Sequence, residues 1–267
     1  MNQSTLPTSR FYYSKPKKEH NDKVFSRLSS CDPVIIRSKK KAIFEKIQSL
    51  VLEQISLKEF SSEHYECFNC LSLSGRKIEN ILEIGSFKGL TAAYLAILFP
   101  NSRVHSIDLP ASSDEYINTY GRQNSVSEFV EKRTSLLDLF ANITFSGIPS
   151  TTFLFNSNQK YDLIWIDGDH SYPQVCIDII QSLNILEDSG VIMVDDIYRF
   201  GKKLPENHLK SVAAFETIEN LYTSNIITRD YIYKRTVLKR DFKNNLSQLD
   251  PLDKSISILT RSSNNTY

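Results

Sequence analysis

The segment at residues 161–198 constrains the fold more than any other part of the chain. Its sequence, YDLIWIDGDHSYPQVCIDIIQSLNILEDSGVIMVDDIY, predicts a short apolar strand, an amphipathic helix and a second apolar strand. The first strand runs into residues 167–170 (DGDH) and the second into residues 195–196 (DD). A strand–helix–strand crossover makes the two strands parallel, so both acidic ends lie at one edge of the sheet. Open α/β sheets bind their ligands at that edge, which is where we predict the functional site.

Length and composition fit one large α/β domain with extensions. The chain has 267 residues, of which 40% are hydrophobic, and its net charge of +1 gives no general attraction to nucleic acid. No apolar run approaches the roughly 18 residues of a membrane span, and the first residues lack the apolar core of a signal peptide. The four cysteines are typical of free thiols in a reducing compartment. We therefore expect a cytoplasmic protein whose partners include neither nucleic acid nor membrane, and we leave a homo-oligomer open.

Strand and helix patterns alternate through the middle of the chain. Strands are predicted at residues 78–84, 104–107 and 142–146, with one or two closing strands within residues 226–239. This alternation predicts a doubly wound, mostly parallel sheet. We divide the chain into a polar arm (1–33), a helical cap (34–75), the α/β domain (76–242) and a polar C-terminal tail (243–267).

The turn after the first strand indicates which cofactor the domain accepts. A dinucleotide-binding turn has the pattern G-x-G-x-x-G, but Phe87 stands at the middle glycine of the sequence Gly85-Ser86-Phe87-Lys88-Gly89 and obstructs a pyrophosphate. Glu83, just before the turn, would also repel phosphate. S-adenosylmethionine carries a sulfonium, an ammonium and no phosphate, so it suits this acidic edge. Asp108 follows the turn by about 20 residues, the spacing of a carboxylate that accepts both ribose hydroxyls.

Four segments together resemble a known family. LEIGSFKGLTAAYLA, HSIDLP, YDLIWIDGDHSY and SGVIMVDDI are similar to the class I S-adenosylmethionine-dependent methyltransferases. The most similar branch has IDGDH after its fourth strand and DD after its fifth. It includes the sugar O-methyltransferases of macrolide and aminocoumarin biosynthesis and, more distantly, the catechol O-methyltransferases. The resemblance covers about residues 78–200 and implies a Rossmann-like, seven-stranded sheet whose last strand is antiparallel to the others.

The resemblance also implies which residues contact the cofactor. The turn from Glu83 to Gly89 would surround the methionine moiety, Asp108 would bind the ribose, and residues 147–150 would flank the adenine, although the acidic residue often found there is absent. For Asp167, cofactor contact and a purely local role at the strand end stay equally open. The predicted cofactor contacts are Glu83, Gly85, Ser86, Phe87, Gly89, Asp108, Ser150 and Asp167.

Three carboxylates match the metal ligands of the metal-dependent members, namely Asp169, Asp195 and Asp196. Oxygen-only ligands suit Mg²⁺ or another hard divalent cation. Such an ion would orient a substrate hydroxyl and lower its pKa for attack on the sulfonium methyl group. Asp169 or His170 would accept the proton, and His208 is a weaker candidate.

We therefore predict an S-adenosylmethionine-dependent, metal-assisted O-methyltransferase whose partner is a small hydroxylated molecule, a sugar or a secondary metabolite. Two alternatives remain open. The same fold could carry out a different, hydroxylase-like reaction, or it could bind a cofactor without catalysis.

Overall fold

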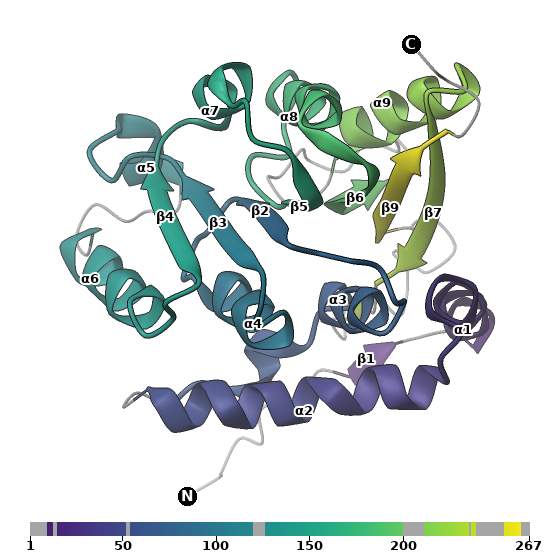
Figure 1. Ribbon diagram of the computed structural model, residues 1–267, viewed down its shortest axis with the longest axis horizontal. Coiled ribbons are helices and arrows are strands. Elements are labelled where there is room, and N and C mark those ends of the chain that lie inside the picture. Colours follow the sequence, from purple (N-terminus) through teal and green to yellow (C-terminus); the bar gives the residue numbers. More distant parts are fainter. Residues whose placement is uncertain are drawn as a thin grey trace, which may run out of the picture.

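A large β-sheet with helices on both faces forms the body of the protein (Figure 1). The computed structural model describes residues 10–12, 15–51, 54–119, 126–199, 211–234, 236–238 and 254–262. The strands of the large sheet are β2 (Asn80–Ile84), β3 (Arg103–Asp108), β4 (Ile143–Gly147), β5 (Tyr161–Ile166), β6 (Leu186–Tyr198), β7 (Ile227–Tyr233) and β9 (Lys254–Arg261).

The strand order confirms the predicted architecture. Within the described residues the large sheet has seven strands in the order β4-β3-β2-β5-β6-β9-β7. β2, β3, β4, β5 and β6 pair in parallel, whereas β9 is antiparallel to both of its neighbours, β6 and β7. The fold is therefore a Rossmann-like, doubly wound and mostly parallel sheet, and its last strand is the antiparallel one.

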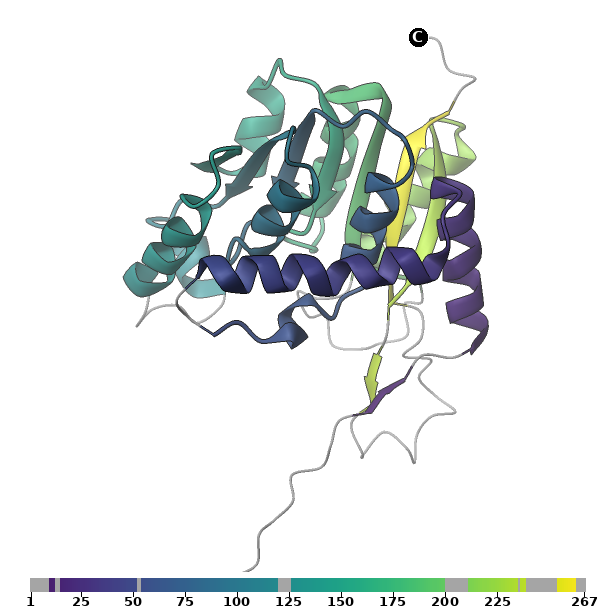
Figure 2. The same ribbon diagram turned by 60° about the horizontal axis from the view of Figure 1, so that its bottom comes forward.

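Two layers of helices cover the sheet. One face packs against α7 (Ser150–Asn156), α8 (Gln174–Asn184) and α9 (Val212–Thr223), and the other against α3 (His64–Ser72), α4 (Leu90–Leu98) and α6 (Val126–Leu137). A longer helix, α2 (Pro33–Leu50), lies across α3 and α4 (Figure 2). Short helices, η1 (Leu57–Phe60) and α5 (Asp114–Thr119), lie in the connections. In the described part of the chain, no helix is both long and apolar enough to cross a bilayer.

The central strands β2, β5 and β6 are buried on both sides, as a parallel sheet between helices requires. In β5, Leu163 and Trp165 belong to the core under α3 and α4, whereas Ile164 and Ile166 belong to the core under α8 and α9. This alternation follows from the two-residue period of a strand. It explains why β5 has an almost continuous apolar sequence.

The N-terminal region departs from the prediction. Residues 1–33 were expected to form a polar arm, but α1 (Lys15–Ser29) is a helix beside β7 (Figure 1). Its Asn21 side chain donates to the Tyr233 carbonyl and accepts from the Tyr233 amide, both at 2.9 Å. Val24 and Phe25 are buried in the core. The arm prediction is wrong for this helix. Few of its residues are apolar, and its polar side chains bond to residues far away in the sequence, so no local pattern marks it.

A short strand precedes α1. β1 (Arg10–Tyr12) pairs antiparallel with β8 (Thr236–Leu238) in a separate two-stranded sheet. The predicted closing strands within residues 226–239 are therefore β7 and β8, of which β7 alone joins the large sheet.

The C-terminal tail was also mispredicted in part. Residues 243–267 were expected to be a polar tail, but β9 lies between β6 and β7 and is buried from Ser255 to Leu259. Its sequence, KSISILTR, alternates serine with isoleucine, and the serines are small enough to fit between a sheet strand and its covering helices. The strand has eight residues in a polar surrounding, so its pattern was too short to stand out. Apart from Ser262, the other tail residues lie outside the described ones.

The central position of β9 in the sheet predicts how its substitution changes the free energy of unfolding. Leu259 is fully buried and aligns with Ile192 of β6 and Arg229 of β7. Leu259→Ala should lower the free energy of unfolding by about 2–5 kcal/mol, because it removes buried methyl groups and leaves a cavity. Urea denaturation measures this loss. The control Thr260→Ala, on the more exposed side of the same strand, should cost less than about 1 kcal/mol. Equal losses would contradict the placement of β9 in the core.

Candidate active site

The register of the parallel strands brings four chain segments to one edge of the sheet. Ile84 aligns with Ile107 of β3 and with Ile166 of β5, and Ile166 aligns with Val194 of β6. The next residue in each strand is therefore Gly85, Asp108, Asp167 or Asp195. The expectation that the acidic strand ends meet at one edge is confirmed for these residues.

The first turn lies directly against the loop after β5. Gly85 has φ +97°, and a Cβ atom there would lie 2.3 Å from the Asp167 carbonyl oxygen. The Gly85 amide donates to the Ile107 carbonyl at 2.9 Å, and the Asp167 amide donates to the Ile84 carbonyl at 2.8 Å. Glycine is required at this position by both its backbone conformation and the close approach. At the end of the turn, Gly89 has φ +77° and lies against Leu137 of α6.

Phe87 closes the turn to a pyrophosphate. It has a left-handed backbone, with φ +46°, and its amide donates to Asp108 Oδ2 at 2.9 Å. A phosphate group would need a free backbone amide in this turn, whereas the Phe87 amide already donates to Asp108. The Phe87 side chain is partly exposed at the surface of the turn and contacts the Phe129 ring. These contacts support the sequence argument against a dinucleotide.

Glu83 and Ser86 present polar atoms that lack partners. Glu83 is fully buried and accepts a hydrogen bond from the Ser106 hydroxyl through one carboxylate oxygen. Among the described residues, its other oxygen, Oε1, has no hydrogen-bond partner, and neither does the buried Ser86 Oγ. Burial raises the pKa of Glu83 well above its usual range. An ammonium group of a ligand would supply the missing donor, so this part of the site fits the amino-acid end of S-adenosylmethionine.

Asp108 is held by the surrounding chain. Its Oδ1 accepts from the Leu109 amide at 2.8 Å, and its Oδ2 accepts from Phe87 and lies 3.4 Å from Arg133 Nη1. Oδ1 keeps a lone pair for a ribose hydroxyl, whereas Oδ2 already accepts two hydrogen bonds. Arg133, on α6, was not predicted, and it lies over the Phe145 ring at 4.1 Å. No local pattern marks this arginine, because 25 residues separate it from Asp108.

Ser150 begins α7 and is engaged within the protein. Its hydroxyl donates to Asp178 Oδ1 at 2.8 Å and accepts from the Gln174 amide group at 2.9 Å. Asp178 is buried on α8, and burial raises its pKa to about 6. Cofactor contact by Ser150 stays a prediction.

Asp167 and His170 lie together at the end of β5. His170 Nε2 is 3.4 Å from Asp167 Oδ1 and 4.0 Å from Asp196 Oδ2. Burial by itself would lower the pKa of His170, but the Asp167, Asp196 and Asp195 carboxylates outweigh it and raise that pKa. Burial and the Asp195 charge raise the pKa of Asp167. Asp167 therefore belongs to the cluster at the sheet edge.

Asp169 does not join that cluster. It is exposed, and its two oxygens accept from the Ser171 amide and the Ser171 hydroxyl, both at 2.8 Å. This local turn is a common use of aspartate after a strand. The structure thus does not bring the predicted ligands Asp169, Asp195 and Asp196 together. His208, the weaker candidate for proton transfer, lies outside the described residues.

Two lysines neutralise the carboxylates after β6. Lys234 Nζ lies 2.7 and 2.9 Å from the two oxygens of Asp195 and 2.9 Å from Asp196 Oδ1. Lys254 Nζ lies 2.5 Å from the same Asp196 oxygen. Burial would raise the pKa of Asp195, but the Lys234 ammonium outweighs it and holds that pKa well below its usual range. The four groups carry no net charge together.

The residues present therefore do not fit the predicted Mg²⁺ or another divalent ion. Lys234 lies where an ion bridging Asp195 and Asp196 would have to lie, and Asp169 is turned away. Over the described ranges, no three His, Cys, Asp or Glu side chains come together as a metal site.

His64 approaches the same carboxylates from the helical cap. It begins α3, and its Nδ1 lies 3.6 Å from Asp195 Oδ2, while its ring packs against Trp165 with centroids 4.9 Å apart. Neither ring nitrogen has a hydrogen-bond partner within the described part of the chain. Sequence spacing gave no reason to place this histidine at the site.

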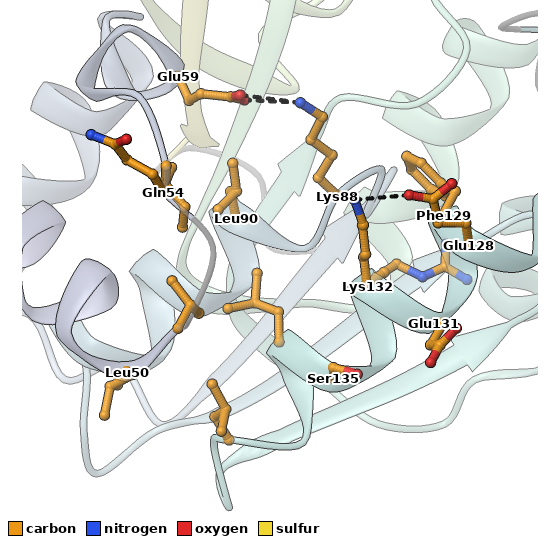
Figure 3. A pocket seen from close by; sticks show the side chains of 15 residues that line it. Leu50, Gln54, Glu59, Lys88, Leu90, Glu128, Phe129, Glu131, Lys132 and Ser135 are labelled. Atoms are coloured by element: carbon orange, nitrogen blue, oxygen red, sulfur yellow. Dashed lines mark hydrogen bonds and ion pairs between the residues drawn. The ribbon is translucent and has the colours of Figure 1, made fainter. Parts of the chain in front are cut away.

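A cavity of about 830 Å³ lies to the side of the first turn, between the end of α2, the start of α4 and α6 (Figure 3). Its rim carries two ion pairs, Lys88 with Glu59 at 3.1 Å and Lys132 with Glu128 at 3.0 Å (Figure 3). None of the predicted cofactor, metal or catalytic residues lines it. The cavity lies beside the carboxylate cluster, since Arg133, which pairs with Asp108, is among the residues that line it.

Comparisons with known proteins agree with this fold. Residues 82–197 match the family described as "Methyltransferase domain". A structure assigned as an O-methyltransferase of Klebsiella pneumoniae superposes with TM-score 0.51 at 15% identity, covering 93% of this chain and 100% of that one. The O-methyltransferase of Bacillus cereus in complex with SAH superposes with TM-score 0.50 at 14% identity, covering 92% and 99%. The comparison with curated protein sequences gave no match.

Gly85→Ala tests the close approach of the first turn. We expect at least tenfold weaker binding of S-adenosylmethionine by calorimetry, because the methyl group would push the turn away from Asp167. Gly75→Ala is the matched control, since Gly75 has φ +73° with nothing within 4 Å of its Cβ position. That variant has similar backbone strain and should bind normally. Equal weakening in both variants would contradict the role of the close approach.

Asp178→Asn tests the burial of the acid beside Ser150. An acid whose folded pKa is raised destabilises the fold as pH rises from its unfolded pKa, about 3.9, to its folded pKa, which is about 6 here. Between pH 4 and 7, the unfolding free energy of the unsubstituted protein should therefore fall by about 2 kcal/mol relative to the variant. Urea denaturation across this range measures the difference. A constant difference would show that Asp178 has a normal pKa.

Residues 82–197, which include the parallel strands of the sheet described above, are therefore similar to a methyltransferase domain.

Proposed function

We propose that the protein transfers the methyl group of S-adenosylmethionine to a hydroxyl oxygen of a small molecule. The observation that carries the proposal is the buried pair Glu83 and Ser86, whose unpartnered oxygens lie at the end of β2 beside Asp108. Transfer to oxygen is supported by the structures of similar fold, which are named as O-methyltransferases. A sugar or secondary metabolite as acceptor is supported by the IDGDH and DD segments alone.

Different residues at this edge of the sheet would bind different parts of the cofactor. Glu83 Oε1 and Ser86 Oγ would accept from the ammonium group, and Asp108 would accept from the ribose hydroxyls. Gly85 lets the turn lie against Asp167 without a side chain in between. When bound, the cofactor supplies a methyl group on a positively charged sulfur.

His170 is the residue that we propose as the general base. Asp167, 3.4 Å from Nε2, favours the tautomer with hydrogen on that nitrogen, which leaves Nδ1 as the acceptor. Nδ1 has no hydrogen-bond partner among the described residues. In the proposed step, the acceptor hydroxyl gives its proton to His170 and its oxygen forms the bond to the methyl carbon. The carbon–sulfur bond breaks, and its electron pair returns to sulfur as a neutral thioether.

The proposal uses no divalent ion. The metal-assisted step expected from sequence would need Asp195 and Asp196 to bind a cation other than Lys234, and both are already paired. In place of an ion, His170 acts as the general base that activates the hydroxyl, and the site positions the two reactants.

Glu83→Gln tests the proposed cofactor contact. Calorimetry should show S-adenosylmethionine binding in the micromolar range for the unsubstituted protein. Binding should be about 10- to 100-fold weaker for the variant, because a hydrogen bond to a charged group contributes about 1.5–3 kcal/mol. The matched control is Glu59→Gln, which removes a partly exposed carboxylate that pairs with Lys88.

Three results would contradict the proposal: no heat with the unsubstituted protein, equal binding by Glu83→Gln, or binding of NAD in place of S-adenosylmethionine. Binding without turnover of any hydroxylated acceptor would favour the alternative of a non-catalytic cofactor-binding protein.

A further inference from the structure

We infer that Lys234 and Lys254 take the place of a divalent cation at the Asp195–Asp196 pair, so that this methyltransferase works without a metal. This inference rests on the proposed function, because it concerns the same edge of the sheet. It follows from the contacts that the two lysines make with the carboxylates and with the backbone.

Lys234 makes the contacts expected of a bridging cation. Its ammonium group lies within 3 Å of three carboxylate oxygens, two on Asp195 and one on Asp196. Lys254 adds a second cation on Asp196. The two carboxylates are about 5% exposed and the lysine side chains 13% and 21%, so all four groups are largely shielded from water.

The backbone fixes both lysines at this position. Lys234 follows the last residue of β7, and its amide donates to the Lys254 carbonyl at 2.9 Å, where β9 begins. The preceding residue, Tyr233, is held on both backbone groups by Asn21 of α1. The strand end that carries the ammonium group is therefore tied to the sheet and to a helix.

Charge balance argues against adding a divalent ion. Two carboxylates and two ammonium groups cancel, and the nearby histidines, His64 and His170, bring no negative charge. An added ion would leave two excess positive charges in a buried site unless the lysines moved into water. The acids that would complete a coordination shell are also engaged, Asp169 by Ser171 and Asp167 by His170.

Binding of Mn²⁺, measured by electron paramagnetic resonance, tests the inference without any methyl transfer. The unsubstituted protein should bind no Mn²⁺ at the cluster at up to about 1 mM. Lys234→Met should leave Asp195 without its ammonium partner and bind Mn²⁺ at least tenfold more tightly. Lys234→Arg keeps the charge and should behave like the unsubstituted protein. Lys41→Met is the surface control, since Lys41 is exposed on α2 and pairs with Glu45.

A second measurement keeps the test independent of how well the variants fold. The unsubstituted protein should contain no stoichiometric metal by mass spectrometry, and any turnover should be unchanged by EDTA. One tightly bound Mn²⁺ per chain that Asp195→Asn abolishes, or loss of turnover with EDTA that Mg²⁺ restores, would overturn the inference. Absence of S-adenosylmethionine binding would instead defeat the proposed function, and calorimetry without metal detects that separately.

Discussion

Carboxylates crowded at one edge of a parallel sheet repel each other, and the site depends on the cations that balance them. Strand register brings Asp108, Asp167 and Asp195 to this edge although their negative charges repel one another. Each has an internal partner: the Arg133 guanidinium beside Asp108, the His170 imidazole beside Asp167, and the Lys234 ammonium beside Asp195. Glu83 differs, because its Oε1 has no hydrogen-bond partner among the described residues and burial raises its pKa. It is therefore the carboxylate left for a positively charged ligand.

Segments near the two ends of the chain, predicted from sequence as a polar arm and a polar tail, help to hold or supply the lysines of the site. Lys254 opens β9, a strand inserted between β6 and β7, and Lys234 ends β7. The polar helix α1 holds the end of β7 through Asn21. His64 comes from the helical cap and lies close to Asp195. The terminal regions thus set the electrostatics of a site whose backbone is built by the central strands.

Local patterns predicted the sheet and the cofactor turn. Apolar runs bounded by glycine and aspartate located β2, β3, β5 and the buried part of β6, and the need for glycine at position 85 follows from its turn. Long-range pairings were missed, since nothing near Lys234 or Arg133 in sequence points to Asp195 or Asp108. The prediction of Asp169 as a metal ligand has another cause. Both lie in one turn, and spacing alone does not show which carboxylate faces inward and which bonds to Ser171.

A crystal structure with S-adenosylhomocysteine, grown in Mn²⁺, would test the account most directly. The account predicts the ligand's amino group against Glu83 and Ser86, its ribose on Asp108, and the Lys234 ammonium group between Asp195 and Asp196 with no anomalous density beside it. An anomalous peak coordinated by Asp195 and Asp196, with Lys234 turned away, would contradict the central claim that the protein supplies its own cations. So would a ligand bound away from Glu83.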